Sequence, residues 1–597
     1  MRQRSDLSVE GSATAEGIPV APDMTEPRVP IERAYIDKRV VLLCVWSIVL
    51  AAVTGFIAQG LVALIGIVTN IAFYGRFSTR FVSPAGNHLG LLVLVVPVIG
   101  GLIVGVMARY GSKAIRGHGI PEAMEQVLLN ESRIPARVTL LKPVSAAISI
   151  GTGGPFGAEG PIIATGGALG SLIGQILKTT ADERKILLAA GAAAGMAATF
   201  GSPVSAVLLA VELLLFEFRP RSIVPVALAS AAATAIRMLY VGTEPIFAMP
   251  MLARPSGEAL AAYAIIGALV GWLAVYVTRA VYWVEDLFEK LPIHWMWWPA
   301  IGGLAVGLVG YFAPHTLGVG YDNIEGMVAG RIAGQAVLFL CIMKFISWSI
   351  SLGSGTSGGT LAPLFTIGGG AGVAALGELA TMQFSRFGID PRICALVGMA
   401  AMFAGASRAL LASVVFAFET TLQPMGLLPL LSGCTAGFLV SSLLMRNTIM
   451  TEKLARRGVR VPMEYGADYL DRISVSDACS HAVVTLRDDQ RISEVHALVP
   501  THQGFPVVDR DGRLLGVVTR RDFIDREPFT RVGDLIRRAP AVVFSDMSLR
   551  EAADHMVREE IGRLPVVERA DPSHVVGILT RSDLLSAHPQ RLDEARR

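Results

Sequence analysis

The sequence predicts an all-α polytopic membrane protein with an inverted internal repeat and broken helices, followed by a soluble α/β tandem module. Three observations predict this fold class. Hydrophobic residues make up 52% of the 597 residues and charged residues only 17%, which is too apolar for an ordinary soluble protein. The apolar region repeats its glycine-rich motifs after about 202 positions. A second, shorter repeat follows in a more highly charged region.

Composition also excludes several classes of protein. The formal net charge is only +3, and no run of Lys and Arg with interleaved aromatic residues indicates a nucleic-acid surface. The five cysteines are scattered, without the spacing of a metal site or a disulfide framework. The first 30 or so residues, within the predicted tail 1–38, have no apolar stretch after a basic start, so they do not resemble a cleaved signal peptide. We expect them to form a disordered cytosolic tail.

A membrane domain is expected over residues 39–455, with two repeats over about 40–240 and 258–450. Several of its apolar segments are shorter than the roughly 20 residues that span hydrocarbon, and Gly or Pro interrupts many of them. We therefore expect broken and tilted helices, which usually surround a transport path. The segments include Val40–Gly60, Leu89–Met107, Ile162–Leu177, Ile186–Ala198, Val204–Phe216, Ala259–Val277, Ile301–Phe312 and Ala336–Ile350.

The long repeat matches four motifs in the same order. Gly117-His-Gly119 corresponds to Gly318-Val-Gly320, and Gly195-Met-Ala-Ala-x-Phe200 corresponds to Gly398-Met-Ala-Ala-x-Phe403. Between them, the glycine-rich segment 153–161 matches residues 355–363, and Glu212 has a counterpart in Glu419. Two homologous membrane halves with glycine-rich breaks at corresponding places indicate a substrate site at the repeat interface. This favours a transporter or channel over a membrane-bound enzyme.

The pattern changes after Leu444. Three arginines, Arg456, Arg457 and Arg460, predict that the following region is cytosolic by the positive-inside rule. Beyond a linker (456–472), two modules are expected over 473–526 and 530–588, with a tail at 589–597. Each module has the pattern strand, turn, strand, helix start. Asp511-Gly512 predicts a hairpin, and Thr519 and Thr580 are expected at the N-caps of the following helices.

Three segments have the composition of a helix N-terminus that binds an anion: Gly117–Pro121, Gly157–Pro161 and Gly359–Pro363. Backbone N–H groups at such ends attract an anion with partial charges, weakly enough for release. In each segment Gly allows close backbone approach, and Pro suits the first helical turn, where no N–H donor is needed.

These motifs resemble those of the CLC chloride channel and anion/proton exchanger family over about Val40 to Gly458. The resemblance implies a homodimer with one anion path per subunit, gated by Glu159, which competes with the anion. It also implies that the backbone amides of Thr360 and Leu361 line the central anion site. The anion-binding residues implied are Gly117, His118, Gly119, Ile120, Pro121, Gly157, Ala158, Gly160, Thr360, Leu361 and Met450. The alternative for Glu159 is a buried glutamate that is paired for structure.

Four positions depart from the family pattern. His118 replaces a serine whose hydroxyl touches the anion, and its imidazole either donates to the anion or only packs at the helix end. Ala158 replaces a basic residue, Leu361 a phenylalanine, and Met450 an inner tyrosine. The loss of a charge and a hydrogen-bond donor leaves chloride selectivity open.

Proton coupling is also open. Family exchangers often carry two consecutive glutamates after a helix-starting proline, and the second one accepts the proton. Counted from Pro203, Glu212 matches the first and Leu213 the second. Leucine cannot carry a proton, so this region resembles a passive channel, although some family exchangers lack the second glutamate. We expect Glu212 to hydrogen-bond between helices, with a place on a proton path as the alternative.

The cytosolic repeat resembles a tandem pair of CBS domains over about Ile473 to Ala587. Such pairs often bind ATP, ADP or AMP in the cleft between modules. Asp522 and Asp583 could then accept hydrogen bonds from ribose hydroxyls, and Thr519 and Thr580 could reach phosphate near a helix N-terminus. The alternative is that these residues only cap helices.

We therefore expect an anion channel or anion/proton exchanger in contact with membrane lipid, located in the inner (plasma) membrane of a bacterium with both termini cytoplasmic. A second hypothesis is a membrane receptor or scaffold in which the repeat binds an ion without conducting it, while the CBS pair reports nucleotide status. A magnesium transporter would show converging carboxylates in the membrane, and few are present. No nucleophile and base pair or metal-ligand cluster stands out, so we expect no enzyme, no catalytic residue, no required cofactor and no metal.

Overall fold

A computed structural model describes residues 37–586, except 333, 374–387, 460, 463–469, 471–472 and 497–501. The described residues divide into two compact units on either side of Tyr465 and Gly466. We call them the membrane unit and the C-terminal unit. The predicted tails (1–38 and 589–597) fall outside the described residues apart from Asp37 and Lys38, as does most of the predicted linker.

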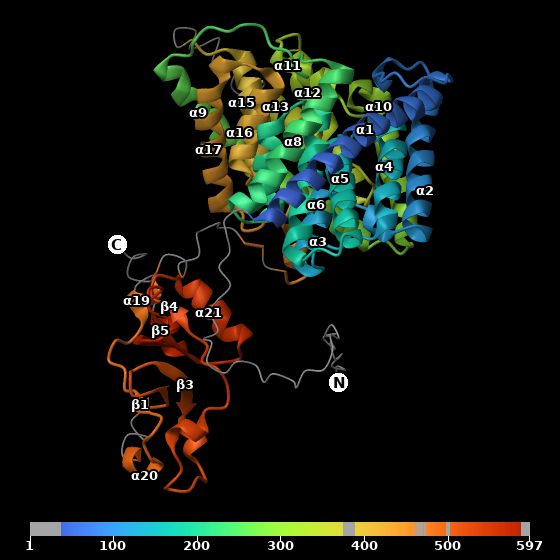
Figure 1. Cartoon of the computed structure of the whole chain (residues 1–597). Coiled ribbons are helices and arrows are strands. Elements are labelled where there is room, and N and C mark those ends of the chain that lie inside the picture. The colour runs from blue at the N-terminus through green and yellow to red at the C-terminus, as the bar shows by residue number, and fades with distance from the viewer. Residues whose placement is uncertain are drawn as a thin grey trace. The chain divides into compact units, whose positions relative to one another are not determined.

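The membrane unit consists of two sets of helices that follow one another in corresponding order (Figure 1). The first set is α1 (Lys38–Tyr74), α2 (Val95–Tyr110), α3 (Ile120–Leu129), α4 (Ala136–Gly151), α5 (Glu159–Ile176), α6 (Ala181–Phe200), α7 (Pro203–Ala210) and α8 (Pro220–Val241). The second is α9 (Gly257–Glu289), α10 (Trp298–Phe312), α11 (Tyr321–Val328), α12 (Gln335–Gly353), α13 (Leu361–Gly372), α15 (Pro391–Ser407), α16 (Leu410–Thr421) and α17 (Leu427–Leu444), followed by the short α18 (Glu452–Arg456).

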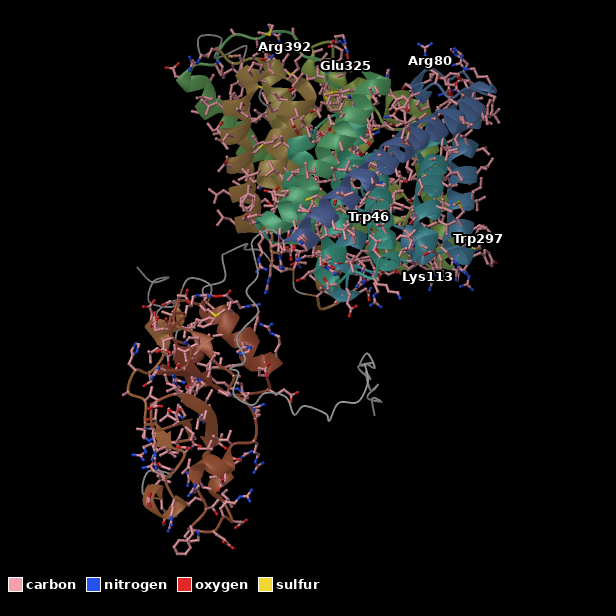
Figure 2. The ribbon with its side chains drawn as sticks, viewed as in Figure 1. Trp46, Arg80, Lys113, Trp297, Glu325 and Arg392 are labelled. Atoms are coloured by element: carbon pink, nitrogen blue, oxygen red, sulfur yellow. The ribbon has the colours of Figure 1, made fainter. Side chains whose placement is uncertain are left out.

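Seven helical segments among the described residues are long and apolar enough to cross a membrane, and several others are shorter. The predicted mixture of full-length and broken helices is therefore present. The 37-residue α1 runs obliquely across other helices of the unit (Figure 1). Charged side chains mark the two ends of the unit, with Arg80, Glu325 and Arg392 at one end and Lys113 at the other (Figure 2). Exposed large apolar side chains on α1, α2 and α9 lie between these ends, as expected for surfaces that face lipid.

The two halves are inverted relative to each other, as the contact between α2 and its counterpart α10 shows. A side chain at Gly101 would overlap the carbonyl of Pro299, and one at Gly303 would overlap the carbonyl of Pro97. These reciprocal contacts require the two helices to run antiparallel. Small residues at the contact allow the backbones to approach closely, as is common between membrane helices.

The apolar segments singled out in the sequence did not include α4 and α8. Helix α4 contains Arg137, Lys142 and Pro143, and α8 begins with Pro220-Arg221 and contains Pro225. Charges and prolines interrupt the apolar run in both helices. In α4 the charge of Lys142 is compensated by hydrogen bonds that only the folded structure supplies.

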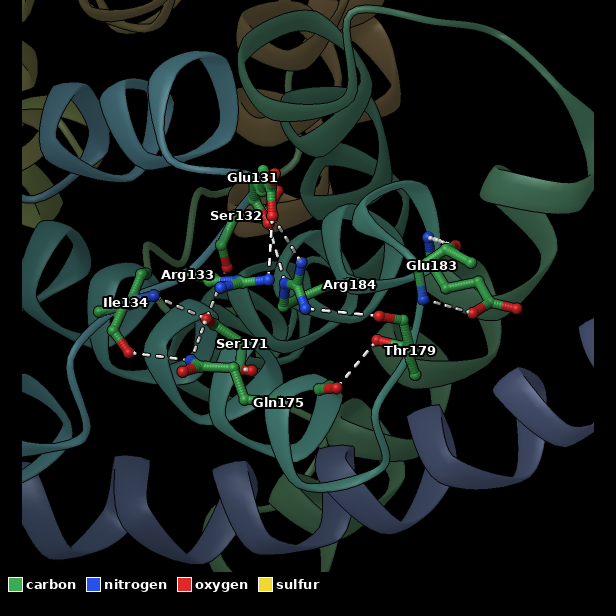
Figure 3. A network of polar contacts seen from close by, with 11 residues as sticks. Glu131, Ser132, Arg133, Ile134, Ser171, Gln175, Thr179, Glu183 and Arg184 are labelled. Carbon is green, nitrogen blue, oxygen red and sulfur yellow. Dashed lines mark hydrogen bonds and ion pairs between the residues drawn. The ribbon is translucent and has the colours of Figure 1, made fainter. Parts of the chain in front are cut away.

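The loop between α3 and α4 is tied to α5 and α6 by a network of polar contacts (Figure 3). Ser171 accepts a hydrogen bond from the N–H of Ile134 (2.8 Å) and donates one to the carbonyl of Ser132 (2.6 Å). Gln175 donates to the carbonyl of Ile134 (3.0 Å), and Arg184 donates to the carbonyl of Glu131 (2.8 Å). This network anchors the C-terminal end of α3 and so helps to hold its N-terminus, which carries the Gly117–Pro121 segment.

The described residues of the C-terminal unit form two three-stranded sheets of the same topology. Each has a parallel pair followed by an antiparallel hairpin, with Gly504 opposite Thr519 in one sheet and Arg563 opposite Thr580 in the other. The predicted hairpin turn at Asp511-Gly512 is present, and Gly512 has a φ of 82°. The strands are β1 (Leu486–Arg487), β2 (Gly504–Val508), β3 (Leu514–Thr519), β4 (Val543–Phe544), β5 (Arg563–Val567) and β6 (Val575–Thr580), and the α-helices are α19 (Val475–Ala478), α20 (Ile492–Val495) and α21 (Leu549–Arg558).

Candidate functional site

The three glycine-rich segments meet inside the membrane unit. Gly359 donates a backbone hydrogen bond to Gly157 (2.9 Å), and Gly157 donates one back (3.2 Å). The N–H of Gly358 also points at the carbonyl of Gly117 at 3.5 Å. Helices α3, α5 and α13 start within a few residues of these contacts, so the N-termini of three helices converge from both halves of the chain.

Close packing at this point leaves no room for side chains. A side chain at Gly160 would overlap the carbonyl of His118, and one at Gly119 would overlap the carbonyl of Gly160. Gly117 and Gly119 also have φ values of 90° and 97°, which favour glycine. We call the place where the N-termini of α3, α5 and α13 meet the convergence site. Its backbone is fixed by glycines that the sequence repeat had singled out.

Glu159 is the first residue of α5 and is only 1% exposed. Its Oε1 accepts a hydrogen bond from the hydroxyl of Tyr321 (2.9 Å). Its Oε2 has no hydrogen-bond partner of normal geometry within the described ranges, and lies beside Gly157 and Gly359. A buried carboxylate that is only partly satisfied carries a free-energy cost, which is typical of functional positions in membrane proteins.

Sequence reasoning missed Tyr321, which is the first residue of α11. Its ring makes edge contacts with Phe200 and Phe247, at centroid distances of 5.8 and 5.9 Å. The available signal was the repeated Gly-x-Gly motif, since Tyr321 directly follows Gly318-Val-Gly320.

Two buried lysines were also missed, and they are related by the repeat. The ammonium of Lys142 donates to the carbonyls of Ile115 (2.9 Å) and Gly117 (2.8 Å). The ammonium of Lys344 donates to the carbonyls of Thr316 (3.0 Å) and Gly318 (2.8 Å). Each lysine holds the loop that leads into α3 or α11. Lys344 also interacts electrostatically with Glu159.

His118 is buried beside the convergence site, and its Nδ1 has no hydrogen-bond partner among the residues that the structure describes. Nearby, Glu122 accepts a hydrogen bond from the N–H of Gly119 (2.7 Å) and pairs with Lys453 (3.3 Å). The α3 N-terminus therefore already has one carboxylate acceptor.

The other predicted anion-site residues are buried in the membrane unit. Thr360 is the N-cap of α13, Leu361 is its first residue, and Ala158 is the N-cap of α5. Met450 is fully buried, and its N–H donates to the hydroxyl of Thr448 (3.2 Å). The remaining predicted positions, Ile120 and Pro121, form the buried first turn of α3.

Glu212 forms hydrogen bonds that join the two halves of the membrane unit. Its two carboxylate oxygens accept hydrogen bonds from the N–H groups of Leu411 (3.0 Å) and Ala412 (3.1 Å), at the start of α16. Its counterpart Glu419 accepts from Val204 and Ser205, both at 2.9 Å, at the start of α7. Each glutamate thus satisfies N–H groups at the N-terminus of a helix in the other half.

In the C-terminal unit, two Thr–Asp pairs each close the turn that follows a strand, one after β3 and the other after β6. Thr519 donates both its N–H (2.8 Å) and its hydroxyl (2.6 Å) to Asp522, and Thr580 does the same to Asp583 (2.7 and 2.8 Å). Each threonine occupies the expected N-cap position, but its hydroxyl donates to the aspartate. One oxygen of each aspartate is therefore already engaged.

A cavity of about 440 Å³ lies in the C-terminal unit, between the end of β3 and the segments 538–541 and 560–563. Thr519 lines it together with four arginines, Arg520, Arg521, Arg538 and Arg563. Clustered guanidinium groups favour an anionic ligand, phosphate above all. The arginines were not singled out in the sequence.

Two inverted halves, broken helices and helix N-termini that converge on a buried carboxylate define a membrane transport protein. Residues 100–442 match the family described as "Voltage gated chloride channel", and residues 475–528 and 532–589 each match the CBS domain. The chain belongs to this chloride channel family, the CLC family, and carries two C-terminal CBS domains. It is an integral membrane protein of a family that transports anions.

Known proteins agree with this placement. The chain is 26% identical over 411 residues to a ClcB-like chloride channel protein of Ralstonia nicotianae, covering 66% of this chain and 96% of the relative. It is 28% identical to the H(+)/Cl(-) exchange transporter ClcA of Vibrio campbellii, covering 68% of this chain and 88% of the relative. The crystal structure of a slow cyanobacterial Cl-/H+ antiporter has the same fold, with a TM-score of 0.64, 24% identity, and coverage of 71% of this chain and 98% of that one.

Proposed function

We propose that this protein carries small inorganic anions, chloride foremost, through one path in each subunit of a homodimer, and that Glu159 gates the path. The observation that supports this proposal is the buried Glu159 carboxylate, which lies where the N-termini of α5 and α13 meet, with the N-terminus of α3 packed against them. Backbone N–H groups there would favour an anion without trapping it. A carboxylate in the same place competes with the anion, so it must move or become neutral before an anion passes.

The test is anion efflux from liposomes that contain the full-length protein, measured with chloride and other halides while the external pH is recorded. Glu159→Gln and Glu159→Ala cannot ionise, so both should alter the flux and remove the pH dependence due to this carboxylate. The exposed Glu258→Gln is the control and should behave as wild type. Unchanged flux and pH response in both Glu159 variants would contradict the assignment.

The same recordings distinguish a channel from an exchanger. Leu213 follows Glu212 where a proton-accepting glutamate is common in family exchangers, and both carboxylate oxygens of Glu212 accept backbone hydrogen bonds. These observations support conduction without protons. Proton movement coupled to anion efflux would instead establish exchange by another proton path. ClcA of Vibrio campbellii is an H(+)/Cl(-) exchange transporter, and the cyanobacterial protein is a Cl-/H+ antiporter.

We further propose that the cavity in the C-terminal unit binds an adenine nucleotide and so modulates the flux. The supporting observation is the four arginines that surround the cavity with Thr519, because they provide charge-assisted donors for a polyphosphate. Asp522 and Asp583 are not among the residues that line the cavity, and the second carboxylate oxygen of Asp522 pairs with Arg537 at 3.4 Å. On this proposal a bound nucleotide would draw both aspartates to its ribose hydroxyls, and Asp522 would give up this ion pair.

Calorimetry on the full-length protein with ATP, ADP and AMP tests this second proposal. Arg538→Ala should weaken binding of the more highly charged nucleotides most, whereas Asp522→Ala or Asp583→Ala should weaken all three similarly. Basal flux should remain close to that of wild type. Absence of heat with each nucleotide on the unmodified protein would mean that the CBS pair has a structural role.

We also propose that the protein lies in a bacterial inner membrane with both termini cytoplasmic. The arginines after α17 support this orientation. Labelling of single cysteines introduced at Ser5 and Glu594 in intact and permeabilised cells would test it.

A further inference from the structure

We propose that the hydroxyl of Tyr321 is a latch that holds the Glu159 carboxylate inside the path and sets how much acid is needed to open it. This inference rests on the proposed role of Glu159 as the gate. It assigns a positioning role to a side chain from the opposite half of the repeat. The hydroxyl of Tyr321 and Oε1 of Glu159 are 2.9 Å apart, well within hydrogen-bond distance.

The carboxylate depends on this phenol because Tyr321 is the side-chain hydrogen-bond donor to it, beside the backbone N–H groups of Glu159 and Ala362, which also interact with the carboxylate. Oε2 has no hydrogen-bond partner of normal geometry in the described part of the chain. The charged and titratable groups that act on Glu159 there are Tyr321 on α11 and Lys344 on α12, and Asp322 lies close to Lys344. The ammonium of Lys344 is already engaged by the carbonyls of Thr316 and Gly318. Tyr321 is therefore the side chain that can stabilise the inward carboxylate directly.

The tyrosine is held in place independently of Glu159. Its ring packs edge-on against Phe200 and Phe247, and Phe200 packs in turn against Phe416 at 5.0 Å. The loop before it is fixed by Lys344 through the carbonyl of Gly318. Removal of the hydroxyl alone should leave the ring where it is.

The repeat shows that the hydroxyl is not required by the scaffold. Tyr321 corresponds to Ile120 in the first half, because both follow the Gly-x-Gly motif and both begin a helix. The backbone there accepts an alkyl side chain in an equivalent place. The second half thus has a phenol where the first half has an alkyl side chain, and its hydroxyl points at the Glu159 carboxylate, the proposed gate.

A hydrogen bond donated to the charged carboxylate favours the closed form, which protonation must disrupt. Without the hydroxyl, less acid should open the path. Tyr321→Phe should therefore raise flux at neutral pH and move the pH of half-maximal flux upward by about one unit, a tenfold change in the gating equilibrium. A purely structural loss would lower flux at every pH without moving this midpoint.

The experiment compares flux against pH in liposomes for wild type, Tyr321→Phe, Glu159→Ala and the double variant. Tyr263→Phe is the matched control, since it removes another buried phenol, which accepts a hydrogen bond from Asp390 far from Glu159 along the chain. The control should keep the wild-type midpoint. In the Glu159→Ala background, Tyr321→Phe should have no further effect on the pH profile.

The outcomes separate the two proposals. If Glu159→Ala leaves flux and pH response unchanged, Glu159 does not gate the path, and the proposed role of Tyr321 is overturned as well. If Glu159→Ala changes them but Tyr321→Phe keeps the wild-type midpoint, only the latch is overturned. A midpoint shift that persists without Glu159 would also overturn the latch, because the phenol would then act through another group.

Discussion

The loops that lead into α3 and α11 have the same support but different side chains. A buried lysine, Lys142 or Lys344, donates to two carbonyls in each loop, at corresponding positions. The first loop carries His118 and Ile120, whereas the second carries Val319 and Tyr321. The repeat therefore preserves the contacts that fix the backbone and varies the side chains that the two loops carry. An imidazole is present on one side and a phenol on the other.

The largest effect is expected when this common support is removed. Lys142→Met or Lys344→Met abolishes two charged hydrogen bonds, worth about 1.5–3 kcal/mol each, so stability should fall by about 3–6 kcal/mol. Thermal unfolding in detergent measures the loss, with the exposed Lys290→Met as the control. Similar losses for both lysines would support equal roles. A large loss for one and none for the other would show that the two loops are not equivalent supports.

A smaller effect is expected at the second pair of related residues. Glu212→Gln and Glu419→Gln each weaken two hydrogen bonds to a helix N-terminus, which should cost about 1–2 kcal/mol, as for other N-terminal caps. The two losses should be similar in thermal unfolding. Proton movement per anion should not change in either variant if both glutamates only cap helices. A loss of proton coupling in Glu212→Gln alone would instead place Glu212 on a proton path.

The smallest effect is expected at His118, where the two loops differ. If the imidazole faces the anion, acidification should add charge and tighten anion binding by no more than about tenfold, or about 1.4 kcal/mol. Maximal flux should stay equal or fall, because a tightly held ion leaves slowly. His118→Ser should flatten the change in affinity with pH.

This comparison must be made in a Glu159→Gln background, because both side chains could titrate. Anion affinity is measured from the concentration dependence of flux at several pH values. Identical pH dependence with and without the substitution would mean that His118 only packs at the helix end.

The sequence predicted the frame of the site because glycine and proline impose local backbone constraints that are visible without a fold. Gly117, Gly157 and Gly359 were singled out in this way, and the structure brings them together. The predicted hydrogen bonding of Glu212 between helices is also present, although its partners could not be named from the sequence.

Residues whose role depends on a distant partner were harder to find. Tyr321 contacts Glu159 from 162 positions away. Its place directly after the repeated Gly-x-Gly motif marked it as the start of a helix but did not reveal its partner. Lys142 and Lys344 did carry a signal, because they are 202 positions apart (344 − 142), the displacement of the repeat. The threonines of the CBS pair were placed correctly at helix starts, but the direction of their hydrogen bonds depends on side-chain geometry.

Glu212 and Glu419 each accept hydrogen bonds from a helix N-terminus in the other half of the membrane unit, and this arrangement has a consequence for biosynthesis. The N–H groups of Val204 and Ser205 find their acceptor in Glu419, which is 215 positions beyond Val204. At about 5–20 residues per second, the ribosome needs roughly 10–40 s to make the intervening chain. During that interval the first half has an incomplete helix end at α7. Water, lipid headgroups or a membrane chaperone must satisfy these N–H groups until the second half emerges.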